Sequence, residues 1–126
     1  MGKYFDELSR AMTFLGEQGD TIFLGQAVEY KGTAMTNTLK GVPRTKLLEM
    51  PVCEEMQMGM TNGLAIAGSV PISIFPRWNF LLLGANQLVN HLDKYSIYTD
   101  GDYQPKAIIR TGIGSMRPLN PPIQHT

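Results

Sequence analysis

The chain has 126 residues, with 11 basic and 11 acidic side chains and a formal net charge of zero. A chain of this length predicts one domain with a modest core. Zero net charge gives no electrostatic argument for binding nucleic acid or an anionic membrane. Apolar runs such as residues 80–83 are far shorter than the roughly 20 residues that span a bilayer.

Cysteine and histidine are both scarce. The single cysteine, Cys53, has no partner for an internal disulfide, which fits a reducing compartment. The first residues lack the apolar segment of a secretory signal. One cysteine and two histidines give no metal-ligand cluster at useful spacing. We therefore expect a cytoplasmic protein without a metal held by this chain, in which Cys53 is a small buried side chain.

The first half of the chain alternates between helix and strand patterns. Apolar residues at helical spacing predict a helix over 3–17. The continuous apolar run 21–24 predicts a strand buried on both faces. Residues 26–32 have no periodicity, whereas a short helix is possible over 33–40. Residues 46–50 predict a second strand.

A helix is predicted over 54–68, after a turn at Pro51, whose φ is fixed by its ring. Its apolar residues on one side are Met56, Met60, Leu64 and Ala67. Gly59 and Gly63 are four residues apart and are therefore stacked on one face. Each glycine costs about 1 kcal/mol relative to alanine in a helix. This cost indicates close packing of that face, either on the sheet or on another subunit.

The second half continues the alternation, with a strand over 71–75, a helix over 79–95 that Asn79 would cap, and a strand over 106–110. Loop is predicted from there to residue 126. Alternating strands and helices predict an α/β fold, a mostly parallel sheet with helices on both faces, in one domain over 1–126. Ligands of such sheets bind beyond the carboxyl ends of the strands.

Glu54 and Glu55 lie at the junction between the second strand and the following helix. An acid at this position is oriented by the helix start and faces the open edge of the sheet. The alternative is a helix-start carboxylate that stabilises the helix dipole by roughly 0.3–1 kcal/mol. Glu55 lies about 100° further around the helix and is expected to be solvated. Glu54 is therefore the candidate catalytic residue.

Several short motifs occur in one order along the chain: Leu24-Gly25, Pro51-Val52-Cys53-Glu54, Gly63-x-Ala65-x-Ala67-Gly68, Phe75-x-x-Trp78-Asn79-Phe80, and Asn86-Gln87-Leu88-Val89-Asn90 with His91. Taken in register from about Tyr4 to Arg110, they resemble one known pattern. It is the N-terminal, pyrimidine-binding domain of the beta subunits of thiamine diphosphate-dependent 2-oxo acid dehydrogenases, of the pyruvate and branched-chain type. The set is similar, more distantly, to the matching domain of transketolase.

The resemblance implies a thiamine diphosphate-binding fold and a role for four residues. Glu54 would hydrogen-bond the aminopyrimidine ring and activate the cofactor, Phe80 would stack on that ring, and Val52 would lie beside it. His125 matches a histidine that faces the substrate. The alternatives are a core position for Phe80 and a surface tail position for His125.

Some positions depart from the family pattern. Gln26 and Ala27 stand where the family usually carries an acidic pair. The Gly-Asp-Gly…Asn signature that holds Mg²⁺ and diphosphate is absent, and in this family it lies on a separate alpha subunit. The chain also stops earlier than such a domain usually does, which predicts a C-terminally truncated fragment or one piece of a split enzyme.

The implied function is the pyrimidine-binding half of an intersubunit active site that acts on a small 2-oxo acid. The enzyme would be a dehydrogenase or decarboxylase that works only with an alpha-type partner, which would hold most of the Mg²⁺ site. One alternative is a non-catalytic assembly protein of the same fold that self-associates through the Gly59/Gly63 helix. A second is a transketolase-like subunit for two-carbon transfer.

Overall fold

The computed structural model describes residues 2–114 of the chain. Its elements up to the third strand are helix α1 (Lys3–Glu17), strand β1 (Thr21–Gly25), helix α2 (Ala34–Asn37), the 3₁₀ turn η1 (Arg44–Lys46), strand β2 (Leu47–Glu49), helix α3 (Glu54–Ile66) and strand β3 (Val70–Phe75). A broken helical segment follows, made of α4 (Trp78–Leu81), η2 (Leu82–Gly84), η3 (Gln87–His91), η4 (Leu92–Lys94) and α5 (Tyr95–Tyr98). Strand β4 (Ile108–Thr111) closes the described part.

The four strands form one sheet in the order β2-β1-β3-β4, and every neighbouring pair is parallel. Phe23 of β1 is paired with Leu47 on one side and with Ile72 on the other. The prediction of an α/β fold with a mostly parallel sheet is therefore confirmed. Because all strands run the same way, their carboxyl ends meet along one edge.

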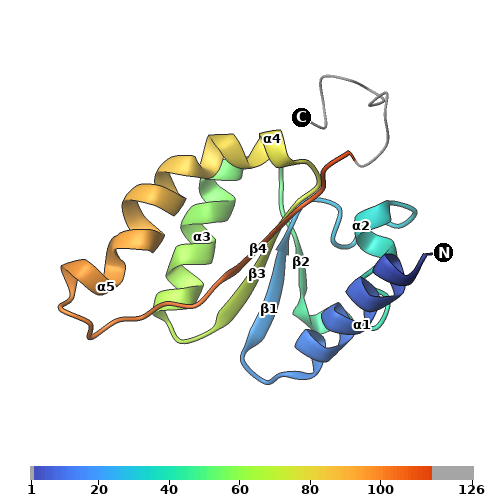
Figure 1. Cartoon of the computed structure of the whole chain (residues 1–126), viewed down its shortest axis with the longest axis horizontal. Helices are drawn as coiled ribbons and strands as arrows, with labels where there is room; N and C mark the ends of the chain where they lie inside the picture. Colours follow the sequence, from blue (N-terminus) through green and yellow to red (C-terminus); the bar gives the residue numbers. More distant parts are fainter. Residues whose placement is uncertain (1, 115–126) are drawn as a thin grey trace.

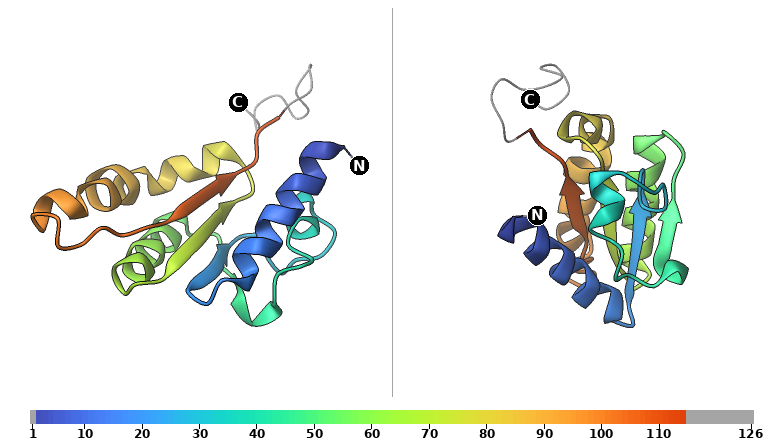
Figure 2. Two further views of the ribbon diagram at one scale, coloured as in Figure 1. Left: turned by 60° about the horizontal axis from the view of Figure 1, so that its bottom comes forward. Right: turned by 90° about the vertical axis from the view of Figure 1, so that its right-hand side faces the viewer.

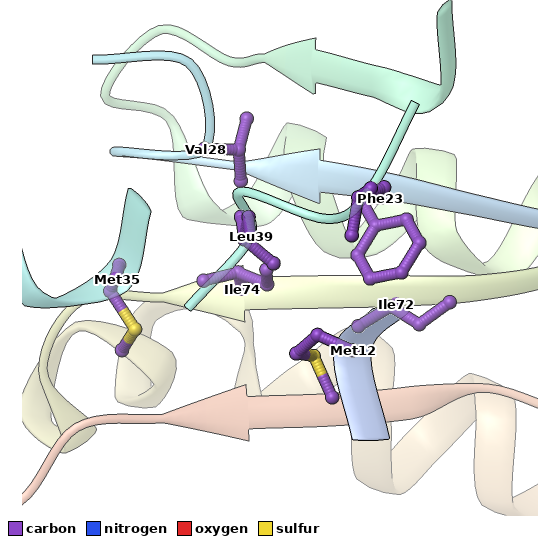
Figure 3. Packing of buried hydrophobic residues seen from close by; sticks show 8 residues of the cluster. Met12, Phe23, Val28, Met35, Leu39, Ile72 and Ile74 are labelled. Carbon is purple, nitrogen blue, oxygen red and sulfur yellow. The ribbon is translucent and has the colours of Figure 1, made fainter. Parts of the chain in front are cut away.

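Helices cover both faces of the sheet. Helices α1 and α2 lie on one side, and α3 lies with the α4–α5 segment on the other (Figures 1 and 2). The first layer packs around Met12, Phe23 and Ile72, which Figure 3 shows close together. The second layer packs around Met58, Phe75 and Leu81. Of the described helices, none has the length and apolar character needed to cross a membrane.

Helix α3 does not bury the apolar side that its sequence suggested. Met56 and Met60 are exposed. The buried residues of α3 are instead mostly polar: Glu54, Gln57, Met58, Thr61, Asn62 and Ala65. Gln57 Nε2 donates to Ser73 Oγ and to the carbonyl of Ile74, both at 3.0 Å. The amide oxygens of Gln57 and Asn62 are buried without a partner among the described residues. Apolar periodicity missed this face because its burial depends on hydrogen bonds.

The helix predicted over 79–95 is broken rather than regular, and Asn79 does not cap it. Asn62 of α3 donates its side-chain amide to the carbonyl of Gln87 at 2.9 Å, where the segment takes the wider π-helical form. A side chain that binds a helix carbonyl competes with the helix's own hydrogen bonds. Gly84 brings the segment close to α3, because a Cβ there would lie 2.6 Å from Met58 Cγ. The breaks therefore follow from close packing on α3.

Candidate functional site

At the carboxyl edge of the sheet, the backbones of β1 and β3 approach each other closely. Gly25, the last residue of β1, has φ of +146°, and a Cβ there would lie 2.0 Å from the carbonyl oxygen of Ile74. Only glycine fits this combination of backbone conformation and contact. Gly25 therefore lets β1 and β3 approach closely at this edge.

Glu54 is the first residue of α3 and lies at this edge with only 6% of its surface exposed. Gln26, the residue after β1, donates its side-chain amide to Glu54 Oε1 at 3.3 Å. The two residues are 28 positions apart in the chain. The structure thus brings together the predicted acid and one of the two residues that depart from the family pattern.

The surroundings of Glu54 suit a group that exchanges a proton. In the part of the chain that the structure describes, the ion pairs are Arg10–Glu7, Arg44–Glu29 and Lys94–Asp93, so no cation pairs with Glu54. Its neighbour Gln26 carries both a donor and an acceptor in one neutral amide, and can therefore hydrogen-bond either the ionised or the protonated acid. A general acid–base group must take up and release its proton in this way.

The other residues of the Pro51–Glu55 segment face outwards. Val52 is 80% exposed, and Glu55 is exposed as predicted. Cys53 is exposed, so its prediction as a buried side chain is wrong. The cause is the loop that joins β2 to α3, which turns these side chains away from the core while it carries Glu54 in. Val52 is thus accessible to a molecule beyond the edge.

For Phe80, the sequence left two interpretations, a core position or a ring that stacks on the cofactor. It is half-buried, and it packs against the cluster of Met58, Phe75 and Leu81. The guanidinium carbon of Arg77 lies 5.6 Å from the centre of its ring. Phe80 therefore contributes to the core while part of its surface stays accessible, and a stacking role remains a prediction.

Three further residues were predicted from the sequence: His125, Gly59 and Gly63. His125 lies outside the described residues. Gly59 and Gly63 are exposed, and a Cβ at either would meet nothing within 4 Å. Of the two alternatives for these glycines, packing on the sheet is therefore wrong, and a contact with another subunit remains a prediction.

Sequence reasoning missed Glu49, at the end of β2. Its carboxylate accepts backbone N–H groups of Ala27, Val28 and Glu29 at 2.7, 2.8 and 2.7 Å. Ala27 has φ of +61°, a conformation that turns successive N–H groups towards one anion. The only signal in the sequence is an acid at a strand end, which is too common to be informative.

At the other side of the sheet, Arg110 of β4 carries a buried Nη1 with no hydrogen-bond partner in the described residues. Burial lowers the pKa of its guanidinium. The residue after β4, Gly112, accepts a hydrogen bond from the backbone N–H of Trp78 at 2.9 Å. This bond ties the start of α4 to the same edge. Within residues 2–114, no three histidine, cysteine or acidic side chains gather as a metal site.

Comparison with known proteins finds a similar protein, whereas comparison with family models finds no match. The chain is similar to the beta subunit of the pyruvate dehydrogenase E1 component of Gracilaria tenuistipitata var. liui, at 32% identity over an alignment of 121 residues. The alignment covers 91% of this chain and 37% of that protein, so the chain spans about a third of the relative's length. No family model matches the chain.

Proposed function

We propose that the chain is a subunit of a thiamine diphosphate-dependent 2-oxo acid dehydrogenase or decarboxylase. It would supply the pyrimidine-binding half of an active site shared with an alpha-type partner. The similarity to a pyruvate dehydrogenase E1 beta subunit over 91% of the chain supports this reading. The parallel sheet covered on both faces agrees with it.

The observation that carries the proposal is the environment of Glu54. A glutamate that is 94% buried as a residue, lies at the carboxyl edge of a parallel sheet and has a neutral amide as its neighbour is suited to exchange a proton with a bound ligand. A purely structural helix-start acid would gain the dipole stabilisation equally well while exposed to water. Burial of Glu54 therefore favours the catalytic interpretation.

We propose that three residues meet the pyrimidine end of the cofactor. Glu54 would bind a ring nitrogen and hold or release a proton there, Phe80 would offer an aromatic face, and Val52 an apolar contact. When bound, thiamine diphosphate supplies the electron sink for decarboxylation of a 2-oxo acid. His125 remains a candidate for a substrate contact.

The name of the relative, which is a beta subunit, supports an alpha-type partner. Such a partner would hold the metal and the diphosphate. The exposed face of α3 around Gly59 and Gly63 would serve self-association, and its open glycines allow another backbone to approach closely. We place the complex in the cytoplasm.

A second candidate function is a non-catalytic assembly protein. It is favoured by one observation, the exposed methionines Met56 and Met60 beside the open glycines of α3. Methionines adapt well to partner surfaces. Such a protein would oligomerise in the same way with and without cofactor. A transketolase-like transfer differs in its donors, which would be sugar phosphates.

Co-expression with the proteins encoded beside this chain tests the proposal. We expect an alpha-type subunit to copurify, calorimetry to detect thiamine diphosphate binding in the presence of Mg²⁺, and the mixture to decarboxylate simple 2-oxo acids. If nothing copurifies and no mixture binds the cofactor, the proposal is wrong. Oligomers that form without regard to cofactor would then favour the assembly protein.

A further inference from the structure

A cavity of about 640 Å³ lies on a different part of the molecule from Glu54. It is bordered by the loop over residues 28–32, by helix α2 and by the segment over residues 39–47 that leads into β2. Its volume is within the range of about 300–1,000 Å³ in which small-molecule sites fall. The proposed function gives this cavity no role.

The inner wall of this cavity is apolar. It contains Val28, Leu39 and Val42, whose exposed fractions are 0%, 2% and 7%. All three belong to the core between the sheet and the first helical layer. Because these three side chains expose almost no surface, they fix the shape of the wall by packing. The accessible lining of the cavity as a whole is more apolar than polar, which favours an aliphatic group over water.

The outer rim is cationic. Lys31, Lys40 and Arg44 line it, against the single carboxylate of Glu29. Arg44 approaches Glu29 only to 4.0 Å and keeps 89% of its side chain exposed. An exposed pair of this kind contributes little stability, so the guanidinium stays available to another anion. Three cations around one opening concentrate positive charge in a chain whose net charge is zero.

The loop beside the cavity is held in place before any ligand arrives. Glu49 binds the backbone of Val28 and Glu29, as described above. Thr36 of α2 donates its hydroxyl to the carbonyl of Ala27 at 2.9 Å. A pocket formed in advance loses less conformational entropy on binding.

From these observations we propose that the cavity binds a small organic anion, an oxyanion carried on a short aliphatic body. The cationic rim selects the oxyanion, since lysine and arginine form charge-assisted hydrogen bonds with carboxylates and phosphates. The apolar wall selects the aliphatic part. Both a carboxylate and a phosphate ester have this chemistry. The site does not depend on the role of Glu54.

The test uses the full chain and four probes: hexanoate, hexyl phosphate, acetate and hexylamine. Calorimetry gives the affinities, and NMR shifts of the Val28 and Leu39 amides locate the binding. We expect hexanoate or hexyl phosphate to bind at least about tenfold more tightly than acetate, because acetate leaves the apolar wall uncovered. Hexylamine, which has the same body and the opposite charge, should not shift these amides. Whichever hexyl anion binds more tightly identifies the headgroup.

The charge requirement is tested with K40Q/R44Q, which changes two exposed side chains. This variant should bind the hexyl anions at least about tenfold more weakly, as expected when charge-assisted contacts are lost. The control is K106Q, an exposed lysine in the loop before β4, which should bind as the wild type does. The proposal is overturned if neither hexyl anion shifts the pocket amides, if hexylamine binds as tightly, or if K106Q weakens binding as much as K40Q/R44Q. Because wild-type protein with the four probes already separates these outcomes, a folding defect of the variant would not decide the question.

Discussion

The side-chain amide of Gln26 lies 3.3 Å from the carboxylate of Glu54, and it joins the end of β1 to the start of α3. A neutral hydrogen-bonding group therefore positions the one buried acid at the carboxyl edge of the sheet. In the dehydrogenase beta subunits that the sequence resembles, an acid usually stands at the position of Gln26. In this chain the amide avoids placing a second carboxylate against Glu54, where two like charges would disfavour each other.

The first prediction concerns this contact. Q26A should lower the turnover of the reconstituted enzyme by roughly threefold to tenfold, because a typical hydrogen bond contributes about 0.5–1.5 kcal/mol net. The turnover number is the quantity to measure, together with the affinity for cofactor, which should change little. Q18A is the matched control, since among residues 2–114 the Gln18 amide donates to the carbonyl of Phe14 on α1 alone. Equal turnover in Q26A and wild type would remove the positioning role.

The second prediction concerns the loop held by Glu49. E49Q should lower the free energy of unfolding by about 1–3 kcal/mol, because an amide presents one acceptor oxygen and one donor group to N–H donors that need acceptors. Urea unfolding measures this difference. E17Q, at an exposed acid on α1, should leave stability within about 0.5 kcal/mol of wild type. Similar values for E49Q and E17Q would contradict the importance of the three N–H contacts.

The third prediction concerns Gly25. G25A should destabilise the chain by more than about 2 kcal/mol, since its Cβ would lie 2.0 Å from a backbone carbonyl and its φ of +146° strains any other residue. Thermal unfolding measures the loss. A G25A protein as stable as wild type would mean that β1 and β3 can separate at this edge.

The fourth prediction separates folding from assembly at α3. G59A and G63A meet nothing within 4 Å, so each should stabilise the isolated chain by about 1 kcal/mol through helix propensity. The same changes should weaken self-association if another backbone packs on these glycines. Unfolding experiments and analytical ultracentrifugation measure the two effects. A gain in stability with unchanged assembly would exclude this face as the subunit contact.

The sequence predicted the fold well because its strands are apolar runs and its turns are marked by glycine and proline. Helix 3–17 and the strand starting at residue 21 were found with almost the observed bounds. Glu54 was selected from its place at a strand-to-helix junction and from motif order, and the structure shows that it is buried. Its catalytic role stays a prediction.

What sequence reasoning missed depends on polar contacts between distant segments. The buried face of α3 is held by Gln57 and Asn62, whose partners lie in β3 and in the segment after α4. Contacts of this kind leave no periodicity. The three hydrogen bonds from the backbone of residues 27–29 to Glu49 also join distant segments. They depend on the backbone conformation of Ala27, which the sequence does not show.

The central claim is that Glu54 exchanges a proton with the bound cofactor. Its most direct test compares E54Q with E55Q in the complex reconstituted with the alpha-type partner, thiamine diphosphate and Mg²⁺, by measuring the rate of 2-oxo acid decarboxylation. Glu55 is the matched control, because it is the same acid one residue further along α3 and is exposed. E54Q should lose roughly 100-fold to 10,000-fold in turnover while it still binds the cofactor, and E55Q should retain wild-type turnover. An E54Q enzyme that turns over as fast as E55Q would contradict the claim.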